Sequence, residues 1–262
     1  MMKRELLNTL ADPELKVIAA KFLDKVMQSG KYHEKVFTAF LSPVAQETCE
    51  KLFWQLKEDL QLLTFGGHDS TEYKMIGIAP SYLTIEESDF PIGLIVATVR
   101  AKTHDLTHRD VLGALMSLGF QRNRIGDLWI SENEIQIIGD VDMLAYISGQ
   151  LEKIGRYSVD CELKPLDQLK LPVAETEELF KTVPSLRLDA LLAAGYNLSR
   201  SAALALIQGD KVKLNHLPIA HANHMLKEGD LIACRGKGRM FLTAVEGTSK
   251  KDRIKIRITK MC

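Results

Sequence analysis

The segment from residue 91 to residue 163 constrains the fold more than any other, because strand and helix patterns alternate there in a definite order. Its first stretch, PIGLIVATVR, is a continuous apolar run of the kind found in a buried strand. In the helix pattern that follows, Thr107 can cap the first turn and Asp110 has the spacing of a capping box. The predicted elements are a strand at 91–100, a helix at 107–120, strands at 125–131 and 134–139, a helix at 141–154 and a strand at 156–163.

The order strand-helix-strand-strand-helix-strand predicts a ferredoxin-like unit, the arrangement that also underlies the RRM fold. Helices of these lengths would cover one face of the sheet. An RRM that stacks RNA bases carries aromatic side chains on its central strands. The corresponding strands here, GLIVATVR and EIQIIG, contain no aromatic residue. We therefore do not expect this sheet to bind RNA by base stacking.

Residues 1–72 show helical patterns. Pro13 can occupy a first turn, and an apolar face recurs after it at helical spacing until Gly30. A second helix is expected over about residues 45–60, and Ser42 can cap it. The turn sequence FGGHDS then closes this region.

The charge of the chain changes sharply along its length. Residues 181–262 hold 15 Lys and Arg against 6 Asp and Glu, a net charge of +9. Because the whole chain has 34 of each kind, residues 1–180 carry −9. Before the basic part, residues 164–183 contain prolines and the acidic run ETEE, a composition typical of a linker. The asymmetry suggests that the basic part meets a polyanion.

The basic part predicts a small α+β module. Arg187 and Arg200 stand in the first turns of two short helices, where the helix dipole favours anions, and Ser199 can cap the second. Lys211 and Lys213 are two residues apart, so their ammonium groups project from one face of the following strand. The loop sequence RGKGR adds cations, and its glycines let the backbone approach a phosphate chain closely.

This module resembles the S4 RNA-binding domain, because RLDALL, SRSAA, KVKLN and LKEGD occur in that family's order and spacing. FLSPVAQE, FGG, THRDVLGALMSLGF, IGDLWI and LEKIGRYSV are similar to signatures of the YlmH family of bacterial S4-domain proteins. The second resemblance covers nearly the full length. It implies an RNA-binding protein associated with the large ribosomal subunit and with tRNA-bearing stalled complexes. In Gram-positive bacteria the genes of this family often lie near cell-division genes, which suggests a further connection.

Carried over by position, the resemblance marks a set of RNA contacts in the basic part. They are Arg187, Ser199, Arg200, Lys211, Lys213, Asn215, Arg235, Lys237 and Arg239. The sequence departs from the family pattern at Ala202, Asp210, His216 and Val44. The family commonly has glycine at the position of Asp210; aspartate tolerates the left-handed conformation, so the turn can survive. Its charge is expected to weaken phosphate binding locally.

Together these patterns predict an α+β chain with a C-terminal strand extension. In order, they give a helical N-terminal region at 1–72, a ferredoxin-like (RRM-like) domain at 73–163, a linker at 164–183 and an S4 domain at 184–262, whose first helix Ser185 can cap. In the extension, Ile254, Ile256 and Ile258 alternate with basic residues, which predicts a half-buried strand. We expect that strand to extend the basic surface rather than to form an ordinary solubilising edge.

Several sequences that are similar to enzyme motifs lack their necessary context. His108–Asp110 matches a kinase HRD sequence, but no Gly-rich loop or DFG accompanies it. Arg187–Asp189 is similar to the catalytic loop of pseudouridine synthases, which would need a long α/β body after it. A methyltransferase would need a Gly-rich cofactor loop after a strand, and the nucleotide-binding motifs of a tyrosyl-tRNA synthetase are absent. We therefore expect no enzymatic activity and no cofactor.

Histidines and cysteines do not predict a metal site. His104 and His108 are four residues apart, and His216, His221 and His224 are clustered, but none has a carboxylate or thiol partner at zinc spacing. The cysteines are scattered, without a disulfide framework. The sequence also shows no secretory signal and no apolar run long enough to span a membrane. These features indicate a reducing cytoplasm.

Two functional hypotheses remain open. In the first, the chain is a non-catalytic protein that docks on structured RNA, ribosomal RNA of the large subunit or tRNA, through the basic domain. In the second, the acidic N-terminal two-thirds binds a protein partner in cell division. An RNA-modifying enzyme is the least favoured alternative.

Overall fold

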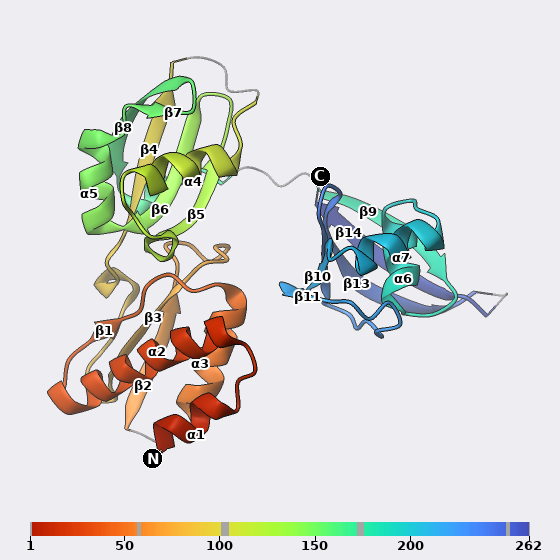
Figure 1. Ribbon diagram of the computed structural model, residues 1–262, viewed down its shortest axis with the longest axis horizontal. Helices are drawn as coiled ribbons and strands as arrows, with labels where there is room; N and C mark the ends of the chain where they lie inside the picture. The colour runs from red at the N-terminus through yellow and green to blue at the C-terminus, as the bar shows by residue number, and fades with distance from the viewer. Residues whose placement is uncertain (1, 57–58, 101–104, 172–175, 250–251, 262) are drawn as a thin grey trace. The chain divides into compact units, whose positions relative to one another are not determined.

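The computed structural model describes residues 2–56, 59–100, 105–171, 176–249 and 252–261. It divides into two compact units, an N-terminal unit of residues 1–172 and a C-terminal unit of residues 173–262 (Figure 1). Both units combine helices with antiparallel sheets, so the predicted α+β class is confirmed.

The N-terminal unit begins with helices packed on a small first sheet. The helices are α1 (Met2–Asn8), α2 (Pro13–Tyr32) and α3 (Pro43–Gln55). The first sheet has the order β1-β3-β2, with β1 (Val36–Phe37), β2 (Leu60–Phe65) and β3 (Met75–Pro80). Phe22 of α2, Phe53 of α3 and Ile78 of β3 belong to one apolar core, which holds these helices against the sheet.

The prediction that residues 1–72 are helical is wrong in part. Helix α3 ends at Gln55, and the predicted end of that helix overlaps Leu60–Phe65, which pair as β2 with the fully buried strand β3. Over so short a stretch the apolar residues of LQLLTF fit a helix or a strand, and only the pairing partner decides between them. Helix α2 also continues past Gly30 and closes at His33, whose φ of 56° is left-handed.

The second half of the N-terminal unit is built on a second sheet in the order β5-β6-β4-β8-β7. Its strands are β4 (Ile92–Val99), β5 (Ile125–Ile130), β6 (Glu134–Asp140), β7 (Lys153–Ile154) and β8 (Tyr157–Lys164). Helices α4 (His108–Ser117) and α5 (Val141–Gln150) cover one face (Figure 1). With β4 between β6 and β8, the order is ferredoxin-like, as predicted. Helix α5 is shorter than predicted because Lys153–Ile154 pair with β8.

The opposite face of the second sheet is covered as well. Leu94 and Ile138 on that face pack with Phe40 and Met75 from the first half of the unit, and Leu166 closes over the same cluster. Because this is the face on which an RRM stacks bases, its burial agrees with the expectation that bases do not stack there.

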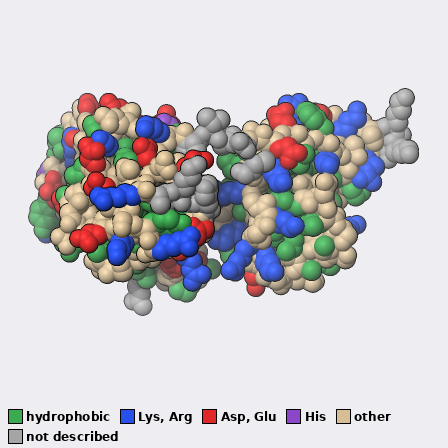
Figure 2. Space-filling view, turned by 90° about the horizontal axis from the view of Figure 1, so that it is seen from above, with side chains coloured by type: hydrophobic (Ala, Val, Ile, Leu, Met, Phe, Trp, Pro, Cys, Tyr) green, Lys and Arg blue, Asp and Glu red, His purple; other side chains and the backbone are tan. Residues whose placement is uncertain are grey.

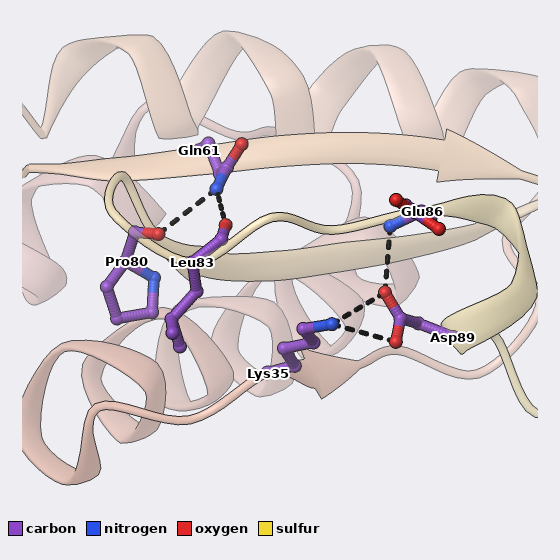
Figure 3. A network of polar contacts seen from close by, with 6 residues as sticks. All are labelled: Lys35, Gln61, Pro80, Leu83, Glu86 and Asp89. Carbon is purple, nitrogen blue, oxygen red and sulfur yellow. Dashed lines mark hydrogen bonds and ion pairs between the residues drawn. The ribbon is translucent and has the colours of Figure 1, made fainter.

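Polar contacts fasten the two halves of the N-terminal unit together. Lys35, just before β1, donates to both carboxylate oxygens of Asp89 at 2.8 Å, in the short helix η1 (Glu87–Asp89) (Figure 3). This bond is the main reason that the pKa of Asp89 lies below its ordinary value. Gln61 of β2 donates to the carbonyl oxygens of Pro80 and Leu83 (Figure 3). The connection from β3 to η1 is therefore tied to the first sheet at both ends.

The C-terminal unit is a sheet with helices on one face (Figure 1). The helices are α6 (Leu188–Gly195) and α7 (Arg200–Gln208). The C-terminal sheet has the order β11-β10-β12-β13-β14-β9, with β9 (Thr176–Val183), β10 (Val212–Leu214), β11 (Leu217–Pro218), β12 (Leu231–Cys234), β13 (Gly238–Thr248) and β14 (Ile254–Met261). Leu191 of α6, Ile207 of α7 and Ile258 of β14 meet in its core.

Two segments near the ends of this unit differ from the prediction. Within the predicted linker 164–183, Thr176–Val183 form strand β9. Its Leu179 and Val183 lie on the face that packs against the core of the unit. Pro165 and Leu166, at the start of that linker, belong to the N-terminal unit, where Leu166 is packed. The predicted C-terminal strand is present as β14, but it lies between β13 and β9 and is not an edge.

Helix starts follow the predicted caps with one exception. The side chains of Ser42, Thr107 and Ser199 accept hydrogen bonds from backbone N–H groups of their helices. The Asp110 carboxylate in turn accepts a hydrogen bond from the backbone N–H of Thr107. Ser185 does not cap α6, because that helix starts at Leu188, three residues later, and Arg187 occupies the cap position. Within the described part of the chain, no single helix is long and apolar enough to cross a membrane; α6 and α7 satisfy that test only together, across a 115° bend.

Candidate nucleic-acid interface

A buried carboxylate joins the two predicted arginines of the C-terminal unit. Asp189, in the first turn of α6, is 4% exposed, and its carboxylate accepts bonds from Arg187 Nε at 3.0 Å and Nη2 at 3.1 Å. Arg200, at the start of α7, donates from Nε to the same carboxylate at 2.9 Å. Burial alone would raise the pKa of Asp189, but the bonds from the two guanidinium groups outweigh it and lower that pKa.

The arginine pair presents positive charge to solvent although its acid is buried. The side chain of Arg200 is 59% exposed and that of Arg187 is 37% exposed. Two guanidinium groups share one carboxylate, so the cluster has a net charge of +1. Backbone N–H groups of Leu188 and Asp189 bond the carbonyls of His224 and Ala222, which fixes the start of α6. The two guanidinium groups are therefore held in place by the buried acid, with positive charge open to solvent.

A second group of cations lies on the outer face of the C-terminal sheet. Lys213 of β10 is opposite Ala233 of β12, which is opposite Arg239 of β13, so these residues share one row and one face. Val212 and Leu214, on either side of Lys213, are buried against α6 and α7. The predicted alternation along β10 is confirmed, and its lysine points away from the core.

The loop between β12 and β13 brings further cations to the same end of the sheet. The N–H of Arg235 donates to the carbonyl of Lys211 at 2.8 Å, so the two residues are neighbours across the strands. Burial raises the pKa of the Cys234 thiol, and the charges of Lys237 and Lys211 oppose that rise. Both lysines therefore lie within electrostatic reach of one thiol. The backbone of Arg235 and the charges of Lys211 and Lys237 thus lie near one another at the start of this loop.

Ser199 and Asn215 have structural bonds within the domain. Ser199 Oγ accepts from the N–H of Ala202 at 3.2 Å and caps α7. The Asn215 amide donates to Asp230 at 2.8 Å and accepts from the N–H of Leu231 at 2.9 Å. Asn215, with His216, has positive φ in the tight turn between β10 and β11. Both residues shape the surface on which the cations stand.

Asp210 has the left-handed backbone that its position requires, with φ of 53°. The expectation that aspartate can replace glycine in this turn is thus met by the backbone. Its side chain is exposed at the end of α7, next to Lys211. A carboxylate therefore stands at the border of the cationic sheet face.

The predicted residues fall into two groups. Arg187 and Arg200 meet at the N-terminal end of α7, whereas Lys211 and Lys213 follow its C-terminal end. A helix of nine residues is about 13 Å long, so the groups are separated by roughly that distance along α7. Figure 2 shows Lys and Arg side chains spread over the visible face of the C-terminal unit.

The sequence did not reveal a cation–π pair between β9 and β14. Phe180 is 63% exposed, and the guanidinium of Arg257 lies over its ring at 5.3 Å. Arg257 also donates from Nε to Glu246 at 3.0 Å. Phe180 was missed because its strand was assigned to a linker. The strand could have been found from Leu179, Lys181 and Val183, which stand at every second position and so share one face, while Phe180 belongs to the other.

Among the residues that the structure describes, no group of three or more His, Cys, Asp or Glu side chains is arranged to hold a metal ion. His216 lies in the β10–β11 turn, and His108 starts α4, where its ring nitrogen is 3.2 Å from the carbonyl oxygen of Leu128. His104 lies outside the described residues.

Known proteins and domains resemble both units. Residues 86–168 match the model of the putative RNA-binding domain in YlmH, and residues 186–232 match the S4 domain. The chain is 33% identical over 240 residues to ribosome-associated protein quality control protein P2 of Bacillus subtilis (strain 168), covering 90% of this chain and 92% of that relative. A solved structure of cell division protein ylmH from Streptococcus pneumoniae is similar with a TM-score of 0.53 and 26% identity, over 62% of this chain and 98% of the other.

Proposed function

Because the chain belongs to the YlmH family of S4-domain proteins, we propose that it is a non-catalytic factor that docks on structured ribosomal RNA. Both matched domains are of kinds that support an RNA-binding role. The observation that carries the proposal is the Arg187–Asp189–Arg200 cluster, in which a buried acid fixes two exposed guanidinium groups. Phosphate is the anion that such planar, paired donors recognise best.

The proposed target is RNA of the large ribosomal subunit, tRNA, or both, in complexes that have stalled. The name of the Bacillus subtilis relative, which describes ribosome-associated quality control, supports this choice. Two cation groups about 13 Å apart also suit the backbone of a folded RNA better than a single small anion. In this proposal the protein works in the cytoplasm and reads RNA mainly by shape and charge.

The test removes one cation from each group. We expect Arg200→Ala with Lys213→Ala to abolish co-sedimentation with large ribosomal subunits, because the phosphate contacts supply most of the affinity. Arg200→Ala also removes one bond to the buried Asp189, so the thermal unfolding temperature should fall, but Arg187 keeps its two bonds to that carboxylate and the variant should remain folded. Lys153→Ala with Lys227→Ala removes two exposed charges elsewhere and should leave binding intact. Undiminished binding by the first double variant would place the docking site outside these groups.

A second candidate function is a protein contact in cell division, favoured by the name of the Streptococcus pneumoniae structure. Its supporting feature in this chain is the net charge of −9 on residues 1–180, which gives the first two-thirds a surface unlike that of the basic part. The full-length chain is used as bait after nuclease treatment. Recovery of a division protein, together with no enrichment of ribosomal RNA in untreated samples, would favour this function over RNA docking.

A further inference from the structure

A cavity of about 400 Å³ opens in the N-terminal unit, between α2, the segment 38–42 and the short helix η2 (Arg122–Arg124). Its volume is within the range of pockets that hold small ligands. Phe40 forms part of its apolar floor and is 3% exposed. The N–H of Phe40 donates to the carbonyl of Asn123 at 2.9 Å, so the two halves of the unit are joined at the cavity itself.

Three cations line this cavity. Lys21 and Lys25 stand one turn apart on α2, and Arg122 faces them from η2. Among the described residues that line the cavity, Glu14 is the one that carries a carboxylate. The field of Arg122 also reaches Asp127, whose pKa is raised by burial first of all. Even when Glu14 and Asp127 are both counted, the net charge at the cavity is positive, which favours the binding of an anion.

An aromatic ring stands beside the cations. The guanidinium of Arg122 lies over the ring of Tyr73 at 4.3 Å, and the N–H of Tyr73 bonds the carboxylate of Asp127 at 3.3 Å. The guanidinium thus covers one face of the ring as a stacked pair, and the bond to Asp127 fixes the backbone at Tyr73. Asn123, exposed at the rim, has an amide that can both donate to and accept from a base edge. Flat aromatic and guanidinium surfaces are what unpaired RNA bases stack on.

The position of the cavity also favours RNA. Arg122 and Asn123 belong to residues 86–168, which match a putative RNA-binding domain. Both faces of the second sheet in that domain are covered, one by α4 and α5 and the other by the cluster around Phe40. The cavity lies beside η2, which leads directly into β5, the edge strand of that sheet.

We propose that this cavity binds a single unpaired nucleotide of RNA. The base lies against Tyr73 and Arg122, and the flanking phosphates meet Lys21 and Lys25. The inference rests on the proposed RNA-binding function and adds a second contact, in the N-terminal unit. A peptide is the alternative occupant, and the experiment below separates the two.

The probe is a fluorescein-labelled oligouridine that carries one 4-thiouridine, and the protein is the full-length chain. Anisotropy should show that Lys21→Glu with Lys25→Glu weakens binding roughly tenfold or more, because two phosphate contacts are lost and reversed. The matched control, Lys16→Glu with Lys31→Glu, changes the same helix by the same charge, at positions that do not line the cavity. It should weaken binding less than about twofold if the cavity holds the nucleotide.

Irradiation of the 4-thiouridine probe gives an independent readout. Mass spectrometry should locate crosslinks at Tyr73 or in residues 38–42, and Tyr73→Leu should abolish the crosslink at residue 73 while thermal unfolding reports whether the variant is folded. Equal losses in the two charge-reversed doubles, or crosslinks confined to the C-terminal unit, would overturn the proposal. Unchanged affinity in the Lys21/Lys25 variant would also overturn it and would favour a peptide.

The same variants distinguish this inference from the proposed function. If Arg200→Ala with Lys213→Ala leaves subunit binding intact while the Tyr73 crosslink persists, ribosome docking through the C-terminal unit fails and the nucleotide site stands. If that variant loses subunit binding and no crosslink reaches the cavity, docking stands and the nucleotide site fails.

Discussion

At the residue scale, the presentation of the arginines depends on a side chain that no RNA needs to touch. Asp189 is buried, yet its carboxylate accepts hydrogen bonds from both Arg187 and Arg200. Without it, each long side chain would have to be ordered on binding, at a cost in conformational entropy. Asp189 is thus a positioning residue, and its value lies in the geometry that it imposes.

We predict that Asp189→Asn lowers the free energy of unfolding by about 1–3 kcal/mol, because a buried hydrogen-bond network loses its charge. The affinity for large-subunit RNA should fall severalfold at the same time. Urea unfolding and filter binding measure the two effects. The control is Asp210→Asn, an exposed acid beside Lys211, which should leave stability nearly unchanged and should not weaken binding.

The lowered pKa of Asp189 predicts how the effect of Asp189→Asn on stability changes with pH. The folded pKa of Asp189 lies below its ordinary value, so its stabilising contribution is present above about pH 4 and is lost as the pH falls through the folded pKa. The difference in unfolding free energy between the native chain and Asp189→Asn should therefore be full at neutral pH and shrink in acid. A difference that stays constant down to the acid limit would contradict the charged network.

At the element scale, the joint between the two sheets of the N-terminal unit depends on a glycine. A Cβ on Gly126 of β5 would lie 2.8 Å from the Phe40 ring and 3.1 Å from Ile138. The backbone of β5 can approach the first half of the unit because nothing projects at this position. Phe40 is also the floor of the proposed nucleotide site, so joint and cavity share a residue.

We predict that Gly126→Ala destabilises the N-terminal unit by about 1–3 kcal/mol through overpacking. Gly113→Ala is the matched control, because a Cβ there meets nothing within 4 Å and the residue lies inside helix α4. That change should stabilise the protein by up to about 1 kcal/mol. Differential scanning calorimetry of the two variants checks both signs, and an unaltered transition for Gly126→Ala would refute the tight joint.

The sequence correctly predicted those elements that depend on interactions between neighbouring residues. The strand at 91–100, the capping box at Thr107 and the cap at Ser199 depend on neighbouring residues, and all are present. Strand β2 was missed because its short apolar run fits a helix or a strand, and strand β9 because its partner β14 lies at the far end of the unit. Prolines and acids near β9 gave it the composition of a linker.

The site was predictable to a similar depth. Spacing along the chain placed Lys211 and Lys213 on one face, and helix starts marked Arg187 and Arg200. Spacing could not show that Asp189 binds both arginines, nor that Asn215 bonds within the domain. The cavity beside Arg122 could not be predicted, since its walls come from four separated segments.

At the scale of the whole molecule, the charge division between the parts of the chain predicts how binding responds to salt. Residues 181–262 carry +9, and five or six of the named cations are expected to meet phosphates. The logarithm of the association constant should then fall against the logarithm of salt concentration with a slope of roughly −4 to −5. Titrations of labelled large-subunit RNA at several salt concentrations measure it, and a flat line would rule out the electrostatic mechanism.

The pairing of β9 with β14 has a consequence for how the C-terminal unit comes into being. In the described part of the chain, β9 pairs with no strand other than β14, although it precedes α6, α7 and every other strand of that sheet. During translation the backbone N–H and C=O groups of β9 that bond β14 stay unpaired until the entire intervening segment has emerged. Pairings between such distant segments form slowly. The order of synthesis therefore delays completion of the very module that we propose docks on ribosomes.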